Sequence, residues 1–151
     1  MMGLNGEREA LTVRDVATGV AHMYPTMTKT AGEVRMSLMH FAGKSTAERQ
    51  IRLVYSDNAV EIGFACRQLK WLHDTSTPGV PQTNSLIERT NQTLVNQTIS
   101  ALDTAGLPPC FWSFAAPCVS MHYNINCLVD VSPWCKTTWA IIPREQNPFW
   151  R

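Results

Sequence analysis

The chain has 151 residues, a length that fits one domain, and 44% of them are hydrophobic, as in globular proteins with a buried core. Its 13 basic and 12 acidic residues give a formal net charge of +1. A protein that holds DNA by itself through many phosphate contacts is usually more basic. Either nucleic acid is not the partner, or other domains supply the basic surface.

The cysteine pattern and the short apolar runs argue against several classes of protein. Five cysteines are an odd number with no C-x-x-C pair, which argues against a disulfide framework and a structural zinc site. We therefore expect an intracellular protein, nuclear or cytoplasmic and not secreted. The longest mostly apolar run, Cys110–Met121, is too short to span a bilayer, and no secretory signal is visible, so no membrane association is expected.

The first half of the chain predicts a hairpin, a helix and a buried strand. Two apolar-rich segments joined by Thr18-Gly19 are typical of a β-hairpin. Thr30 to Glu33 has the capping-box pattern, and Gly43 is the predicted end of the helix that follows. In chain order, we expect a loose end over 1–10, hairpin strands over 11–17 and 20–24, a helix from 30 to 43, and a short buried strand over 51–55.

The second half predicts helices separated by one extended segment. Their apolar residues recur at helical spacing. We expect a helix with Ile62, Cys66, Leu69 and Leu72 on one side, an extended segment over 73–77, a helix with Ile87, Leu94, Val95, Ile99 and Leu102 as its apolar side, and a helix over 111–123 interrupted or begun near Pro117. Gly106 is the expected end of the second of these helices.

Two acidic residues occupy positions that are suited to binding a ligand or a metal ion. Asp57 follows the predicted strand, and the carboxyl ends of strands are where ligands collect in open α/β sheets. Glu88 lies near the start of a helix, after a Pro/Gly-broken loop that could bring it beside Asp57. Two carboxylates delivered in this way suit a divalent cation, since hard cations prefer oxygen ligands.

Each of these acids also has a purely structural explanation. Asp57 could simply end a strand and begin a turn. Ser85-Leu86-Ile87-Glu88 is itself a capping box, in which Glu88 would reach back to the Ser85 amide. His73 is expected to be a hydrogen-bonded core or rim histidine, and Trp112 is expected to fill core space.

Three short strings stand in order: Ser56-Asp57-Asn58, Pro81-Gln82-Thr83-Asn84 and Glu88-Arg89-Thr90-Asn91. Together they resemble the catalytic core of retroviral-type integrases, in the version carried by the Pol polyprotein of copia-like retrotransposons. The likeness extends from about Val13 to about Pro133. The resemblance implies a mixed α/β fold of the ribonuclease H-like kind, with flanking helices.

The resemblance also implies an activity and a set of site residues. In the family, three acids hold two Mg²⁺ or Mn²⁺ ions that serve phosphodiester cleavage and strand transfer during DNA integration. Asp57 and Glu88 correspond to the second and third acids, both catalytic and metal-binding. Gln82, Asn84 and Asn91 correspond to nucleic-acid-binding positions. The implied partners are the DNA of the element ends and of the target, and intact relatives form homo-oligomers.

The chain departs from the family pattern at its first acid. That acid lies on the family's first strand, and counting back from the hairpin puts it at or before Met1. Asp15 is a doubtful third acid, because it aligns inside the second strand. We therefore expect an N-terminally truncated core lacking the first, central strand. The expected division is a loose end over 1–10, a partial core domain over 11–123, and an irregular Trp/Pro-rich extension over 124–151.

The leading hypothesis is thus an integrase-core fragment that is catalytically incomplete. The alternative is a non-catalytic ribonuclease H-like remnant that binds nucleic acid or another protein. A third possibility is a related nuclease that hydrolyses DNA without strand transfer.

Overall fold

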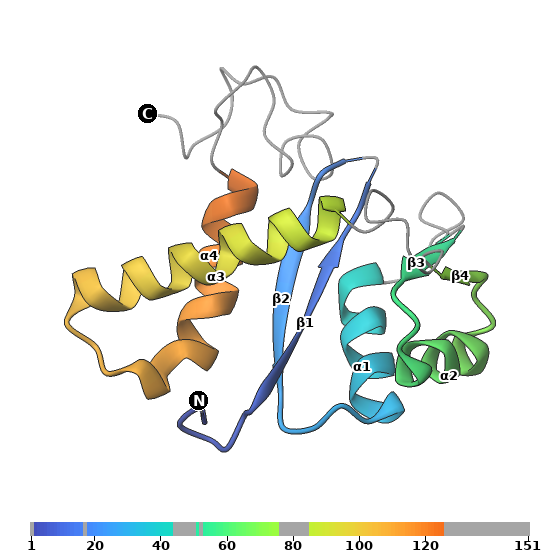
Figure 1. Ribbon diagram of the computed structural model, residues 1–151, viewed down its shortest axis with the longest axis horizontal. Coiled ribbons are helices and arrows are strands. Elements are labelled where there is room, and N and C mark those ends of the chain that lie inside the picture. The colour runs from blue at the N-terminus through green and yellow to red at the C-terminus, as the bar shows by residue number, and fades with distance from the viewer. Residues whose placement is uncertain (1, 17, 44–50, 52, 76–84, 126–151) are drawn as a thin grey trace.

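The computed structural model describes residues 2–16, 18–43, 51, 53–75 and 85–125 (Figure 1). Along the chain these residues form β1 (Glu9–Arg14), β2 (Ala21–Thr26), α1 (Ala31–Ala42), β3 (Val54–Ser56), α2 (Val60–Leu69), β4 (His73–Thr75), α3 (Ser85–Ala105), the 3₁₀ turn η2 (Pro109–Phe111) and α4 (Trp112–Ile125). The expected mixed α/β class is confirmed. Within the described part the strands form two separate two-stranded sheets, β1–β2 and β3–β4.

The hairpin is present where the sequence predicted it. β1 and β2 pair antiparallel, with Leu11 opposite Tyr24 and Arg14 opposite Ala21. β1 begins at Glu9, earlier than expected, and the Leu4 amide just before it donates to the Cys110 carbonyl at 2.9 Å. Because side chains alternate along a strand, the hairpin presents one set of residues to each of its two faces.

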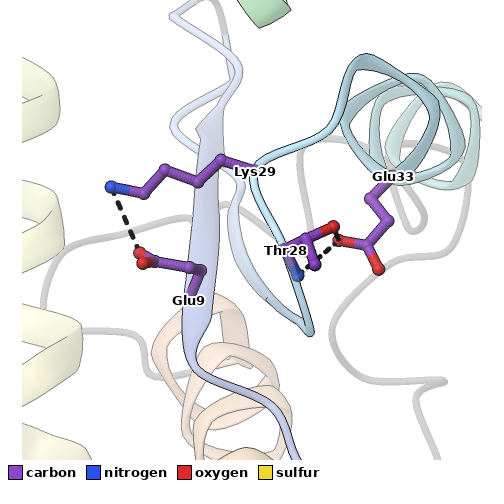
Figure 2. A network of polar contacts seen from close by, with 4 residues as sticks. All are labelled: Glu9, Thr28, Lys29 and Glu33. Carbon is purple, nitrogen blue, oxygen red and sulfur yellow. Dashed lines mark hydrogen bonds and ion pairs between the residues drawn. The ribbon is translucent and has the colours of Figure 1, made fainter.

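Helix α1 has the predicted bounds, but its N-terminal contacts differ in part from a capping box. The Thr30 side chain accepts from the Glu33 amide at 3.5 Å, as expected. The Glu33 carboxylate, however, accepts from the amide and the hydroxyl of Thr28, at 2.8 and 2.9 Å (Figure 2). Beside it, Lys29 forms an ion pair with Glu9 at 3.3 Å, so the loop before α1 is tied both to the helix and to β1 (Figure 2).

The strand before Asp57 is shorter and more exposed than predicted. β3 spans three residues, and Leu53 and Tyr55 are 52% and 42% exposed. The prediction of a buried strand was therefore wrong. The physical reason is that side chains alternate along a strand: Val54 packs against the cluster formed by α1 and α2, so Leu53 and Tyr55 face the opposite, uncovered side. Leu72, expected on the stripe of α2, lies beyond that helix and is exposed.

Helix α3 buries Leu94 and Leu102 as its apolar pattern predicted, with Val95 packed against the core, but two threonines take part in the buried stripe and Ile99 does not. Thr90, Leu94, Thr98 and Leu102 are buried at intervals of four, whereas Ile99 is exposed. The two threonines are accommodated because their hydroxyls donate to carbonyls one turn back, those of Leu86 and Leu94 at 2.8 and 2.7 Å. As predicted, the helix stops before Gly106, which has a φ of 64°.

Helix α4 continues through Pro117 and begins at Trp112. A proline inside a helix costs about 3 kcal/mol, so packing against the rest of the protein must offset that cost. α4 does pack against both β2 and α3 (Figure 1). Trp112 contacts the core from a partly buried position, close to its expected role.

Two hydrophobic cores lie on the two faces of the hairpin. One joins Ala21 and Met23 of β2 to Leu94, Ala116 and Val119 of α3 and α4. The other joins Val34, Leu38, Ala65 and Cys66 of α1 and α2, with Leu11, Val13 and Val54 packed against them. In Figure 1, α3 and α4 accordingly lie on one side of the hairpin and α1, α2, β3 and β4 on the other. In the described ranges, no helix is long and apolar enough to cross a membrane.

Candidate catalytic site

Asp57 directly follows β3 and is exposed. Its position at the carboxyl end of a strand is the one predicted. The strand is held by parallel pairing with β4, in which Val54 lies opposite His73 and Ser56 opposite Thr75. The carboxylate is thus presented to solvent at the end of a short two-stranded sheet.

A serine and a histidine fix the backbone next to that carboxylate. The Ser56 hydroxyl donates to the Asp57 carbonyl at 2.7 Å, and its Oγ lies 2.8 Å from His73 Nε2. Because a hydroxyl has one proton to give, this arrangement requires His73 to donate through its Nε2–H. His73 is therefore a hydrogen-bonded histidine, as expected. The pairing joins residues 17 apart along the chain, and no local pattern signals it.

Glu88 lies in the first turn of α3, which begins at Ser85, and its side chain is exposed. A carboxylate in this position is favourable because the helix N-terminus carries partial positive charge. The helix is held by contacts with α4 and with the hairpin. Both predicted catalytic acids are therefore solvent-accessible, one at a strand end and one at a helix start.

The residues expected to contact nucleic acid divide into two groups. Gln82 and Asn84 lie outside the described residues. Asn91 is exposed on α3, and its Oδ1 accepts a hydrogen bond of 2.8 Å from the Thr12 hydroxyl of β1. This bond helps to anchor α3 to the hairpin. The DNA-contacting role of Asn91 stays a prediction.

Asp15, the doubtful third acid, has a local contact of its own. The Asp15 carboxylate accepts from the Thr18 hydroxyl at 2.5 Å, within the hairpin turn. Among the described residues, no group of three His, Cys, Asp or Glu side chains gathers in a way that could hold a metal ion. The structure therefore does not join Asp15, Asp57 and Glu88 into one three-acid site.

The cysteines give no metal centre or disulfide in the described part. Cys66, Cys110 and Cys118 are free, and burial raises the pKa of the Cys66 thiol. A raised thiol pKa disfavours the reactive thiolate, so Cys66 acts as a small core residue. Cys127 and Cys135 lie outside the described residues.

Comparison with known proteins agrees with the motifs. No protein-family profile matches the chain. The retrovirus-related Pol polyprotein from transposon TNT 1-94 of Nicotiana tabacum is 28% identical over an alignment of 117 residues that covers 74% of this chain. The matched part is only 9% of the length of that polyprotein.

Two solved structures share the fold. The crystal structure of the BIV integrase catalytic core domain matches with a TM-score of 0.59 and 17% identity, over 82% of this chain and 80% of that one. The simian T-cell lymphotropic virus intasome, in complex with PP2A regulatory subunit B56 gamma, matches with a TM-score of 0.63 and 21% identity, over 84% of this chain and 51% of that one. The chain therefore has the fold of a retroviral-type integrase catalytic core and is similar in sequence to a retrotransposon Pol polyprotein.

Proposed function

We propose that this chain is the integrase-core segment of a retrotransposon polyprotein and takes part in DNA integration without being catalytically complete by itself. The observation that carries the proposal is the placement of Asp57 and Glu88 on an integrase-core fold. One follows a strand and the other opens a helix, in the order of the family motifs. The proposed partners are DNA of the element ends and target, and further copies of the chain.

The donor atoms of the site fit a hard divalent cation. Asp57 and Glu88 would be the protein ligands of Mg²⁺ or Mn²⁺, and Mg²⁺ is usually held by one or two carboxylates together with waters and substrate phosphates. When bound, such an ion polarises the phosphodiester and lowers the pKa of the attacking group. The Ser56–His73 pair has a positioning role, because it fixes the peptide that carries Asp57.

The proposed incompleteness follows from the number of acids. The family site uses three, and among the described residues no three His, Cys, Asp or Glu side chains gather in a way that could hold a metal ion. Two exposed carboxylates bind a pair of divalent cations weakly. Each cation keeps most of its bound water, and two carboxylate charges only poorly offset the repulsion between the two cations. Strand transfer would then require a third acidic ligand.

The proposal is tested by metal binding and strand transfer, measured on the whole chain. Mn²⁺ binding, followed by electron paramagnetic resonance of the free ion, should weaken about tenfold or more in Asp57→Asn and in Glu88→Gln. The matched control is Asp103→Asn, which makes the same change at an exposed residue near the far end of α3 and should leave Mn²⁺ binding unchanged. With labelled donor-end DNA and Mg²⁺, no joined product is expected, while circular dichroism shows an intact fold.

The other possible outcomes of these two measurements each lead to a specific conclusion. Joined product that disappears in both site variants would show a complete enzyme and overturn the proposed incompleteness. Cleavage without joining would identify a nuclease. If neither substitution changes Mn²⁺ binding, Asp57 and Glu88 do not form a metal site.

That last result would favour a second candidate, a non-catalytic protein-interaction module. The supporting observation is the apolar surface around β3 and β4, where Leu53, Tyr55 and Leu72 are all exposed. Edges and apolar surface of this kind are used in association between proteins.

A further inference from the structure

A pocket of about 190 Å³ lies where β1, α3 and α4 meet, on the side of the hairpin opposite the face that packs against Val54 of β3. Its lining combines two arginines with hydroxyl groups and one leucine. The lining residues are Arg14, Leu86, Arg89, Thr90, Thr93 and Tyr123. None of them belongs to the site proposed around Asp57 and Glu88, although Arg89 is adjacent to Glu88 in the sequence.

Arg14 is a partly buried cation that has no counter-charge among the described residues. Its Nη1 donates to the Thr90 hydroxyl at 2.7 Å and to the Tyr123 hydroxyl at 3.2 Å. Its Nε is buried and has no hydrogen-bond partner. Within the described part of the chain, no carboxylate lies within ion-pair distance of this guanidinium. Withdrawing a charge from water is costly unless an opposite charge or a full set of hydrogen bonds compensates it.

The remaining polar groups of the pocket add donors and no negative charge. Arg89 is exposed, and its Nε donates to the Ser85 carbonyl at 3.1 Å, which leaves its terminal nitrogens available. The Tyr123 oxygen accepts from Arg14, so its own proton is available to a ligand. In contrast, the hydroxyl protons of Thr90 and Thr93 are already given to helix carbonyls.

We infer that this pocket binds a phosphate group. Two guanidinium groups and a phenol hydroxyl converge on one small space and supply donors only. Guanidinium groups match the oxygens of a phosphate in a forked geometry, and such charge-assisted hydrogen bonds are about twice as strong as neutral ones. The group could belong to the DNA backbone or to a small phosphate compound. The assignment to the DNA backbone rests on the proposed function. Phosphate binding by the pocket does not depend on Asp57 or Glu88.

Titration of the whole chain with inorganic phosphate, at constant ionic strength and followed by NMR, tests the inference. Saturable shifts should map to the Arg89 and Tyr123 signals, and Arg89→Gln should weaken phosphate binding about tenfold or more. Arg14→Lys keeps the positive charge but removes the forked guanidinium group. It should also weaken phosphate binding without unfolding the hairpin. The matched control is Arg35→Gln on α1, away from the pocket, which should bind phosphate as the wild type does.

A second arm separates the two sources of phosphate. Duplex DNA that displaces inorganic phosphate, with an affinity reduced in Arg89→Gln, identifies the DNA backbone as the ligand. Phosphate binding that DNA does not displace identifies a small phosphate compound. Asp57→Asn should bind phosphate normally in either case, so loss of the metal site would leave this result intact. Absence of saturable binding, or equal weakening in Arg35→Gln and Arg89→Gln, would overturn the inference.

Discussion

The two faces of the hairpin are packed in different ways. On the α3/α4 face, apolar contacts are accompanied by hydrogen bonds from side chains to strand atoms. On the α1/α2 face, the core consists of apolar side chains packed against one another. The comparison teaches that one half of this fold is fixed by directional contacts and the other mainly by burial, which is non-directional.

The α3/α4 face shows how a helix can cover a strand edge. The Asn124 side chain accepts from the Ala21 amide at 2.9 Å and donates to the Ala21 carbonyl at 2.8 Å. One turn earlier, Ser120 accepts from the Met23 amide at 3.0 Å. These side chains supply the hydrogen bonds that a neighbouring strand would otherwise give to β2, so its edge is satisfied by α4.

The α1/α2 face carries Asp57 and leaves more apolar surface exposed. Leu53 and Tyr55 flank Val54, and all three stand on or beside β3, which has a single partner strand in the described part. Asp57, one of the two proposed metal ligands, therefore lies on the less constrained half of the molecule, whereas Glu88 stands on α3 of the other half. Local unfolding of β3 is expected to require little free energy, because few apolar contacts hold this strand.

The largest expected effect comes from the core of the α3/α4 face. Leu94 is fully buried, and Leu94→Ala should lower the free energy of unfolding by about 3–5 kcal/mol. Leu38→Ala on the other face should cost less, about 2–3 kcal/mol, because Leu38 keeps a small exposed fraction and most of the side chains packed against its cluster are only partly buried. Urea unfolding measures both values. Ile99→Ala, on the exposed side of α3, is the control and should cost less than about 1 kcal/mol. A larger loss in Leu38→Ala would reverse the comparison.

The next effect tests the directional contacts alone. Asn124→Leu keeps the side-chain volume but leaves the amide and carbonyl of Ala21 without partners, at a cost of about 2–4 kcal/mol in unfolding free energy. Asn96→Leu, at an exposed position of α3, should change stability by less than about 0.5 kcal/mol. Thermal unfolding of both variants gives the measurement. Equal stability of the two would mean that the edge contacts contribute nothing.

The smallest effect is a pH dependence confined to the α1/α2 face. Burial, and to a lesser extent the nearby charge of His40, lowers the pKa of His22 below its usual 6.5. The unfolded chain then binds the proton more readily than the folded one, so stability is complete above pH 6.5 and falls as the pH drops toward the lowered value. In His22→Gln the stability should vary less over this range, whereas His122→Gln, exposed on α4, should behave as the wild type. A steeper dependence in His22→Gln would contradict this sign.

Local signals in the sequence located most of the elements. The hairpin, the start of α1 at Thr30 and the stops before Gly43 and Gly106 were predicted, because turns and caps depend on a few adjacent residues. The positions of Asp57 after a strand and Glu88 at a helix start were also predicted correctly. The order of the three motifs pointed to the integrase-core fold that the solved structures share.

Only the tertiary structure decided which faces are buried and which polar groups meet. Thr90 and Thr98 are buried while Ile99 and Tyr55 are exposed, because burial depends on the neighbours that an element acquires and not on its own apolar pattern. The Arg14 contacts with Thr90 and Tyr123 span 76 and 109 positions along the chain, beyond the reach of any local signal. Such long-range contacts form only when packing brings distant helices and strands together, and they create the phosphate pocket proposed here.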